Sequence, residues 1–175
     1  TDGDEVTIYG SNPLVTDTDN DGVPDPKELK DGTTINNITF TDSNFEAAIL
    51  EILNKEQGPV LTTEVSGITS LDISGKNISD ISEIIYFTSL RDLQANDNQI
   101  TDITPLTSLT SLSSIGLSNN GLTTLANLDN LTALESLNFS DNSITTLNAI
   151  ASVTTLKLLE FHNNNIADIS LVSNF

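Results

Sequence analysis

The sequence contains no cysteine, methionine or tryptophan, and its 175 residues include a single histidine. Without cysteine the chain has no disulfide bond, thiolate metal site or cysteine nucleophile. Basic residues are also scarce: 6 Lys and Arg stand against 25 Asp and Glu, which gives a formal net charge of −19 at pH 7. So few cationic side chains cannot neutralise a phosphate backbone or an anionic bilayer. Nucleic acid is therefore excluded as a partner, and so is insertion into a membrane. No apolar run approaches the roughly 18 residues of a membrane span.

Apolar side chains recur every 22 residues from Ile68 onward, as the series Leu71, Leu93 and Ile115 shows. Self-similarity at a fixed period of this length is typical of a repeat protein. Five such units lie between residues 68 and 175. Apolar alternation around Leu71 predicts a short strand, and a coil of 22 residues is too short for a crossover helix. The seven apolar columns of these units begin at Ile68, Leu71, Ile73, Ile78, Ile81, Ile84 and Phe87.

An eighth column is polar and holds Lys76, Asn98, Asn120, Asn142 and Asn164. An asparagine inside an apolar pattern needs hydrogen bonds, because burying an unpaired amide costs about 1–3 kcal/mol. Its carboxamide has two donors and two acceptor lone pairs, which can satisfy backbone groups where the strand turns away. The column therefore predicts a structural asparagine ladder at Asn98, Asn120, Asn142 and Asn164. We interpret Lys76 as an end effect, with its ammonium group extending to water.

The pattern L-x-x-L-x-L-x-x-N-x-I-x-x-I-x-x-L over residues 68–175 resembles the bacterial leucine-rich repeats of the internalin class. The resemblance implies an α/β fold, a right-handed leucine-rich repeat solenoid. Short parallel strands at Leu71–Ile73 and its equivalents would line the concave face, with 3-10 turns on the convex side. In such a solenoid each unit buries its apolar face only against its neighbours.

Residues 33–67 depart from the repeat pattern and predict a helical N-terminal cap. Ser43 and Glu46 match a capping box, S-x-x-E, and Gly58-Pro59 ends the helix. A brief strand, Ile38–Phe40, precedes the helix. The segment resembles the helical cap of internalin-type repeats, although a helix that binds a partner is an alternative. The apolar face of the helix consists of Phe45, Ala48, Ile49, Ile52 and Leu53.

Residues 1–32 form an acidic segment with nine carboxylates and two lysines. Residues 17–28 match an EF-hand-type loop at the ligand positions, and Gly22 permits its tight bend. Hard Ca²⁺ takes about six to eight oxygen ligands, so this donor set predicts calcium as the cofactor. The alternative is a solvated acidic linker. The expected ligands are the carboxylates of Asp17, Asp19, Asp21, Asp25 and Glu28 and the main-chain carbonyl of Val23.

Pro24 and Pro26 depart from an EF-hand, and the segment instead resembles the thrombospondin type 3-like calcium repeats of secreted bacterial proteins. A truncated loop precedes the complete one, with Asp2 and Glu5 at its ninth and twelfth positions. Phe175 lies in the last apolar column with no polar cap after it. We therefore expect both ends to continue in a longer secreted or cell-surface protein.

The strand positions that face away from the core form the candidate ligand face. These columns contain no Trp, Tyr or Arg, the residues that anchor most interfaces. Their hydroxyls and amides suit a carbohydrate or a wet protein contact, but they also describe a surface that is merely soluble. His162 has no second histidine, cysteine or serine elbow nearby in sequence and is interpreted as a surface residue. The possible ligand-face residues are Asp72, Asp92, Gln94, Asn138, Leu158, Glu160 and His162.

The sequence predicts a non-enzymatic, calcium-binding leucine-rich repeat module with three parts: residues 1–32, 33–67 and 68–175. No catalytic motif is present. Adhesion or recognition of a protein or carbohydrate ligand is the first interpretation. A structural spacer that contacts neighbouring copies of itself, an accessory domain of a larger secreted enzyme, and a dockerin are the alternatives.

Overall fold

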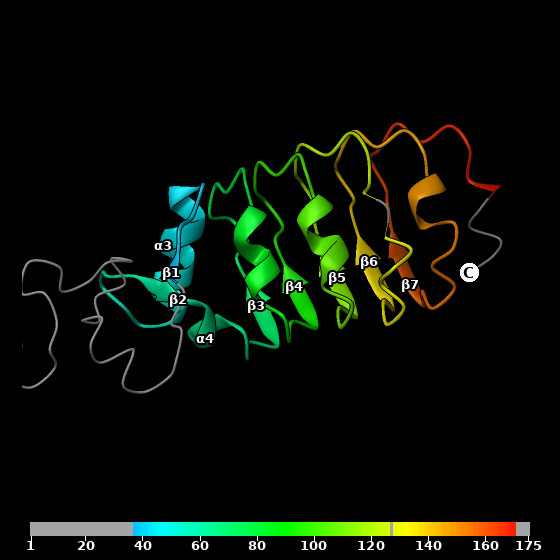
Figure 1. Cartoon of the computed structure of the whole chain (residues 1–175). Coiled ribbons are helices and arrows are strands. Elements are labelled where there is room, and N and C mark those ends of the chain that lie inside the picture. Colours follow the sequence, from blue (N-terminus) through cyan, green and yellow to red (C-terminus); the bar gives the residue numbers. More distant parts are fainter. Residues whose placement is uncertain (1–36, 127, 171–175) are drawn as a thin grey trace, which may run out of the picture.

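The structure is a computed structural model that describes residues 37–126 and 128–170. A row of parallel strands is its main feature. The strands lie side by side in chain order in a five-stranded sheet (Figure 1). Each strand is paired with the next at a shift of 22 residues, as Leu71 with Leu93 and Leu93 with Ile115. The repeat period seen in the sequence is therefore the register of the sheet. The strands are β3 (Ser70–Asp72), β4 (Asp92–Gln94), β5 (Ser114–Gly116), β6 (Ser136–Asn138) and β7 (Leu158–Glu160).

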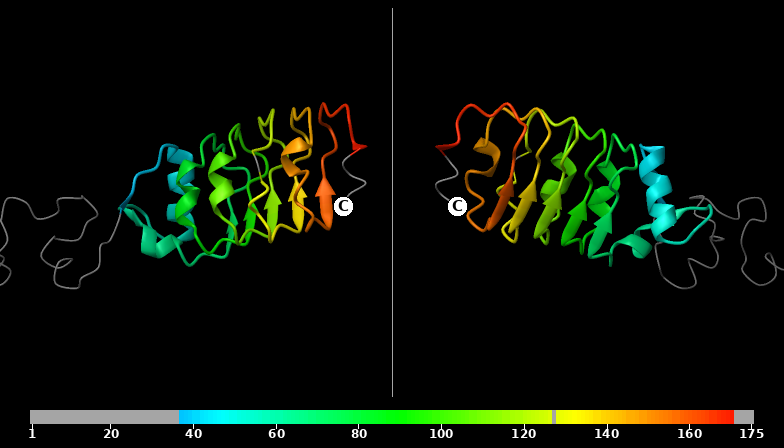
Figure 2. Two further views of the ribbon diagram at one scale, coloured as in Figure 1. Left: turned by 45° about the vertical axis from the view of Figure 1, so that its right-hand side comes forward. Right: turned by 180° about the vertical axis from the view of Figure 1, so that it is seen from behind.

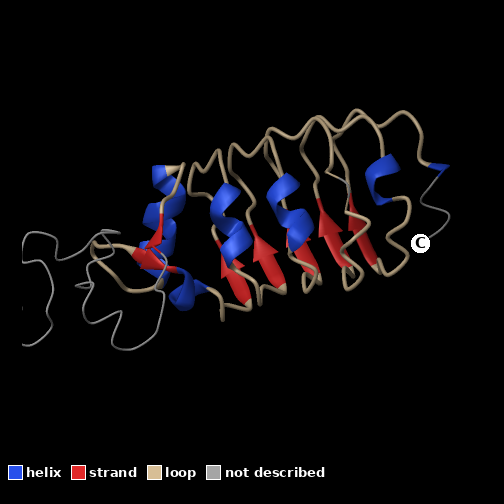
Figure 3. Cartoon of the chain, viewed as in Figure 1, coloured by secondary structure: helices blue, strands red, loops and turns tan. Residues whose placement is uncertain are grey.

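Short 3-10 helices form a second row beside the strands (Figure 3). They are η1 (Ser82–Tyr86), η2 (Thr104–Ser108) and η3 (Asn148–Ile150). The two further views of Figure 2 show the units following one another from the cap to the last repeat. Short parallel strands, 3-10 turns and a 22-residue register together confirm the predicted leucine-rich repeat solenoid. Each strand begins one residue earlier than predicted, at Ser70 rather than Leu71.

The core is a continuous stack of the seven apolar columns. Every member of these columns in the second, third and fourth units is buried. In the first unit only Ile68 is partly exposed, and in the last unit Leu159, Phe161 and Ile166 are partly buried. Burial therefore depends on a neighbour on both sides, as expected when each coil packs only against the coils next to it.

A ninth column, which follows the strands, bends the chain through the left-handed region. Its members have φ between 51° and 67°. Glycine, asparagine and aspartate tolerate this conformation better than other residues, which explains their presence here. In the first four units the main-chain N–H of this residue donates to a carbonyl of the next unit, as Asp97 does to Ser118 at 2.9 Å. The column consists of Gly75, Asp97, Asn119, Asp141 and Asn163.

The cap contains a two-stranded antiparallel sheet and two helices. Its elements are β1 (Asn37–Ile38), α3 (Ser43–Ile52), β2 (Val60–Leu61) and α4 (Thr62–Val65). Phe45 of α3 is fully buried and stacks on Phe87 of the first repeat, with ring centroids 6.2 Å apart. Helix α3 ends at Ile52, several residues before Gly58-Pro59. The cap thus covers the first coil, as the sequence predicted.

Several local predictions about the cap were wrong. The brief strand lies at Asn37–Ile38 and not at Ile38–Phe40, and α3 does not continue to Gly58-Pro59. The N-cap of α3 is Asp42 and not Ser43: its Oδ1 accepts from the main-chain N–H groups of Asn44 and Phe45. Lys76 does not extend only to water, because its Nζ lies 2.6 Å from Oε2 of Glu51 on α3. The asparagine column is therefore broken where the cap helix supplies a carboxylate partner.

Within the described residues, no helix combines the length and the apolar character that a membrane crossing requires.

Candidate functional site: the concave face and its neighbours

The predicted calcium ligands, Asp17, Asp19, Asp21, Val23, Asp25 and Glu28, lie outside the described residues, as does the truncated loop at residues 2–5. Among residues 37–126 and 128–170, no group of three or more histidine, cysteine or carboxylate side chains is placed to hold a metal ion.

The concave face, defined here as the outward side chains of β3–β7 and the residue two positions after each strand, is hydrogen-bonded to itself over the first three units. Asp92 accepts from Ser70 Oγ at 3.4 Å and from Gln94 Nε2 at 3.1 Å. Gln94 in turn accepts from Asn96 Nδ2, and Asn96 accepts from Ser118 Oγ at 3.0 Å. Asp72 accepts from the main-chain N–H of Ser74 at 3.0 Å. Much of the polar capacity of this half is used internally.

Gly116 is at the centre of this face and explains how Gln94 can fold over it. A Cβ atom at position 116 would lie 2.2 Å from Gln94 Oε1. The glycine therefore makes room for a neighbouring side chain, and its φ is not in the left-handed region. The Gln94 amide therefore lies against Gly116 in the middle of the face.

The last unit differs from the others in presenting a large apolar side chain outward. Leu158 is 51% exposed on β7, whereas the paired positions in the other strands are Ser or Asp. Beside it, Glu160 accepts from Asn138 Nδ2 at 2.7 Å. His162 is exposed, with its Nδ1 3.8 Å from Asp141 Oδ2. The structure thus brings Asn138, Leu158, Glu160 and His162 to one end of the face, while Asp72 lies at the other end.

The neighbourhood of His162 contains a serine and an aspartate but lacks the geometry of a hydrolase triad. Ser140 precedes Asp141, and one repeat period separates it from His162. The Ser140 side chain is 1% exposed, and its Oγ has no hydrogen-bond partner, His162 included. A nucleophile must reach substrate and bond to its base, so this arrangement does not support catalysis.

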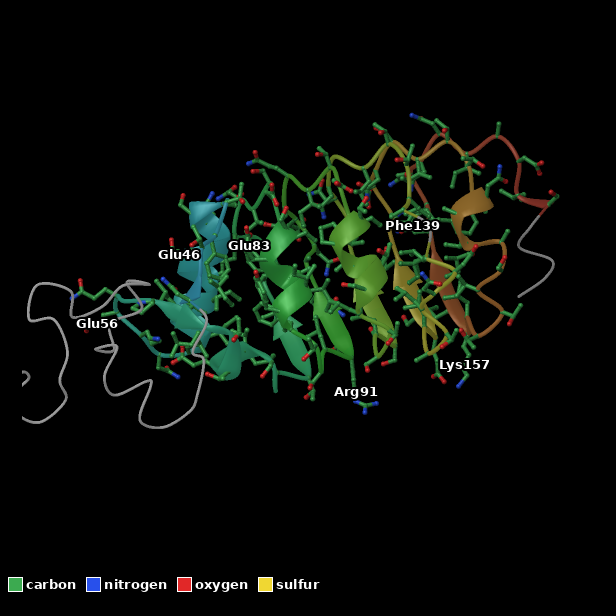
Figure 4. All side chains as sticks on the ribbon, in the orientation of Figure 1. Glu46, Glu56, Glu83, Arg91, Phe139 and Lys157 are labelled. Atoms are coloured by element: carbon green, nitrogen blue, oxygen red, sulfur yellow. The ribbon has the colours of Figure 1, made fainter. Side chains whose placement is uncertain are left out.

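Two cations border the face on one edge. Lys157 pairs with Glu135 at 2.7 Å, and both side chains are largely exposed. Arg91 also lies on this edge, and Figure 4 shows Arg91 and Lys157 pointing away from the ribbon at the lower margin of the molecule. Exposed pairs of this kind contribute little to stability, on the order of 0–1 kcal/mol.

The four ladder asparagines make nearly identical contacts. Each Nδ2 donates to one carbonyl of the preceding unit and to two of its own unit, at 2.9–3.3 Å. Each Oδ1 accepts from a main-chain N–H of the preceding unit, as Asn120 does from Ile100 at 2.9 Å. These bonds satisfy backbone groups at the bend after each strand. The carboxamides of the four ladder residues are thus hydrogen-bonded to the main chain: Asn98, Asn120, Asn142 and Asn164.

Asp42 is the residue that the sequence analysis missed. It is 8% exposed; its Oδ2 accepts from Ser79 N and Oγ, both at 2.7 Å, and from Asp80 N at 3.2 Å. Burial alone would raise the pKa of Asp42, but the hydrogen bonds from Ser79, Asn44 and Phe45 outweigh it and lower the pKa from 3.8 to about 2. One carboxylate thus caps the N-terminus of α3 and links this helix to the first repeat. An aspartate directly before Ser43 was the available signal.

Comparisons with known proteins agree with this architecture. Residues 88–130 match the family model described as leucine rich repeats (2 copies). The chain is also similar to an internalin, InlF, of Listeria monocytogenes, with 26% sequence identity and a TM-score of 0.65. The functional domain of InlJ from the same organism is similar at 27% identity with a TM-score of 0.69. The chain carries leucine-rich repeats with internalin-like structural neighbours.

The leucine-rich repeat array follows a different kind of repeat. Residues 1–16 and 17–33 each match the model of the bacterial TSP3 repeat. The division agrees with the predicted thrombospondin type 3-like segment and places the complete loop, residues 17–28, inside the second match.

The similar structures are longer than the part this chain matches. The alignments cover 77% of this chain and 47% of InlF, and 78% of this chain and 30% of the InlJ domain. A leucine-rich repeat protein of Leptospira interrogans is 26% identical with a TM-score of 0.60, over 71% of this chain and 31% of that protein. The chain therefore spans less than half the length of these three structures. Among curated proteins, none matches the sequence.

Proposed function

We propose that this chain is a non-enzymatic recognition module of a secreted or cell-surface bacterial protein. The observation that carries the proposal is the exposed Leu158 on the concave face. Nothing in the repeat requires an apolar residue there, because Ser70, Ser114 and Ser136 occupy the same column. A half-exposed leucine beside Glu160 and His162 offers an apolar contact surrounded by polar groups, which is the usual composition of a protein-binding patch.

The partner is a protein or a carbohydrate. Next to Leu158, Glu160 offers a carboxylate acceptor and Asn138 an amide on the same face. The charge of −19 favours a neutral or cationic partner. Internalin-like neighbours and bacterial TSP3 repeats support an extracellular setting for such a contact.

Calcium acts in the N-terminal segment of this module. Asp17, Asp19, Asp21, Asp25 and Glu28 would hold the ion with their carboxylates, and Val23 with its main-chain carbonyl. Bound Ca²⁺ supplies positive charge that offsets the repulsion between these carboxylates. At extracellular calcium concentrations, a dissociation constant of about 10⁻⁴–10⁻³ M is sufficient for the site to be occupied.

A binding screen against glycans and bacterial or host surface proteins tests the proposal. The variant is Leu158→Ser, which restores the residue found in three other units. Its matched control is Ile85→Thr, which removes a similarly exposed apolar side chain (43%) on η1, away from the strands. We expect Leu158→Ser to weaken binding at least tenfold, about 1.4 kcal/mol, and Ile85→Thr to leave it unchanged. Equal affinities for both variants would refute the assignment of this face.

A structural spacer is the second candidate, and the hydrogen-bonded first half of the concave face favours it. Side chains that bond to one another, such as Asp92 with Gln94, are less available to a ligand. Small-angle scattering with calcium and with chelator tests this function. A spacer stiffens or self-associates with calcium, whereas an equally extended monomer in both solutions contradicts it. An accessory domain of a larger secreted enzyme is the remaining alternative.

A further inference from the structure

The bend after β5 contains an asparagine followed directly by a glycine, Asn120-Gly121, and this pair occurs nowhere else in the sequence. Strand β5 is the middle strand of the sheet, with two strands on either side (Figure 1). The third coil therefore differs from the others in joining a ladder amide to a glycine. In the other units the ladder column is followed by residues with side chains: Asn77, Gln99, Ser143 and Asn165.

The fold does not require a glycine at position 121. The φ of Gly121 is not in the left-handed region, and the equivalent residue of the next unit is Ser143. A Cβ atom at position 121 would lie 3.0 Å from Cγ2 of Thr101, whose exposed side chain can shift slightly to make room. The same two positions hold Ser143 and Thr123 in the next unit. Neither backbone conformation nor packing therefore explains the glycine.

An asparagine followed by a glycine is prone to spontaneous deamidation, because glycine has no side chain to hinder attack by its own nitrogen. The main-chain nitrogen of Gly121 loses its proton to solvent and attacks Cγ of Asn120. The Cγ–Nδ2 bond breaks, and Nδ2 takes up a proton from solvent and leaves as ammonia, which closes a succinimide ring. Water then adds to one of the two ring carbonyls and leaves either an aspartate or an isoaspartate at position 120.

Both reacting groups are held by hydrogen bonds in the native coil. The N–H of Gly121 donates to Ile100 O at 2.9 Å, so the nitrogen is not free to lose its proton. Nδ2 of Asn120 donates to three main-chain carbonyls at 2.9–3.2 Å, and Oδ1 accepts from Ile100 N at 2.9 Å. The carboxamide is therefore fixed against the main chain. Ring closure requires these bonds to break, and hence a local opening of the third coil.

The products cannot restore the same bonds. An ionised carboxylate only accepts hydrogen bonds, so an oxygen would replace the donor that lies 2.9 Å from Ala95 O. An isoaspartate also lengthens the main chain by one carbon beside the bond from Gly121 N to Ile100 O. We propose that Asn120-Gly121 is a deamidation site that the native ladder keeps unreactive. Opening of the third coil then makes the loss of its ladder amide permanent.

Peptide mapping by mass spectrometry tests the proposal on the whole chain, aged in mildly alkaline buffer with and without urea. In urea, the peptide with Asn120 should deamidate faster than any other asparagine peptide, and released ammonia should match its loss. In native buffer its deamidation should be at least about a hundredfold slower than in urea. Gly121→Ser copies the next unit; it should slow the reaction several-fold in urea and leave the circular dichroism of the native chain unchanged.

A second variant tests whether coil opening limits the native rate. Asn142→Ala leaves the Asn-Gly pair intact but removes the acceptor of Leu122 N and a donor to Leu117 O. It should speed native deamidation at Asn120 about tenfold or more. Lys76→Ala is the matched control, because it removes only an exposed ion pair at the edge of the ladder and should leave the rate within about twofold. In urea both variants should react at the original rate.

Equal rates in native buffer and in urea would overturn the proposal, because the ladder would then give no protection. A native rate in Asn142→Ala no higher than in Lys76→Ala would also overturn it. The deamidated chain, separated by its added negative charge, should unfold at a lower urea concentration, and unchanged stability would contradict the permanent loss. None of these variants alters an outward side chain of β3–β7, so this proposal and the recognition function fail or stand separately.

Discussion

Removing the Asn120 side chain tests how the solenoid holds its backbone together. In Asn120→Ala, the main-chain N–H of the fully buried Ile100 loses the Oδ1 atom that is its hydrogen-bond acceptor. Three carbonyls lose a donor, but each keeps another. Ala95 O keeps Asn98 Nδ2, Leu117 O keeps Asn142 Nδ2, and Ser118 O keeps the N–H of Asp97.

The expected cost follows from this count. An orphaned buried donor costs about 1–3 kcal/mol, and carbonyls that retain one partner add little. We therefore expect Asn120→Ala to lower the free energy of unfolding by about 2–3 kcal/mol. Lys76→Ala, at the equivalent position of the first unit, removes only an exposed ion pair with Glu51 and should cost about 0–1 kcal/mol. Its main-chain N–H still donates to Asn98 Oδ1.

Urea unfolding followed by circular dichroism measures both losses, and hydrogen exchange at the Ile100 amide reports the orphaned donor directly. The Ile100 amide should exchange faster in Asn120→Ala and at the original rate in Lys76→Ala. Equal destabilisation by the two substitutions, or a protected Ile100 amide in Asn120→Ala, would refute the ladder as a source of stability.

Three further predictions concern the cap, the turns and the metal. Because the pKa of Asp42 is lowered to about 2, its carboxylate contributes about 2 kcal/mol to the free energy of unfolding above pH 4, and this contribution is lost as pH falls through about 2. Urea titrations at a series of pH values should therefore show the stability of Asp42→Asn converging with that of the original chain near pH 2. Gly75, with φ of 67°, should tolerate Asn, the residue at position 119, and lose about 1 kcal/mol on replacement by Val, as thermal unfolding would show; equal losses would contradict the turn argument. Chelation of calcium should leave the far-ultraviolet circular dichroism of the solenoid nearly unchanged and should raise the rate of proteolysis within residues 1–33. Loss of the solenoid signal would contradict this prediction and would show that the calcium repeats stabilise the solenoid.

The sequence predicted the repeat architecture well because the same pattern of apolar residues occurs in all five units. A column such as Leu71, Leu93 and Ile115 repeats at the register of the sheet, so one periodicity specifies the strand pairing and the core together. The cap helix was also predictable from its apolar spacing. Its N-cap was not, because Ser43 and Asp42 both suit the position and only the location of Ser79 and Asp80 decides between them.

The candidate site was predictable in composition but not in geometry. The columns identified which side chains share the concave face, and they singled out Leu158 as different. They did not show that Gln94 folds over Gly116 or that Ser140 is buried beside His162. Such details depend on side-chain rotamers and on contacts between adjacent strands, which the repeat pattern of the sequence does not specify.

What the sequence determined by itself was the repeating coil: its period, its buried columns and its asparagine ladder, because each unit meets a copy of itself on either side and local chemistry is enough. What only the tertiary structure decided lies where the repetition stops. At the cap, Asp42, Glu83 and Lys76 each bond to a partner distant in sequence: Ser79, Thr41 and Glu51. The repeat periodicity does not determine these contacts. They result from the packing of α3 against the first coil, where a non-repeating surface meets a repeating one.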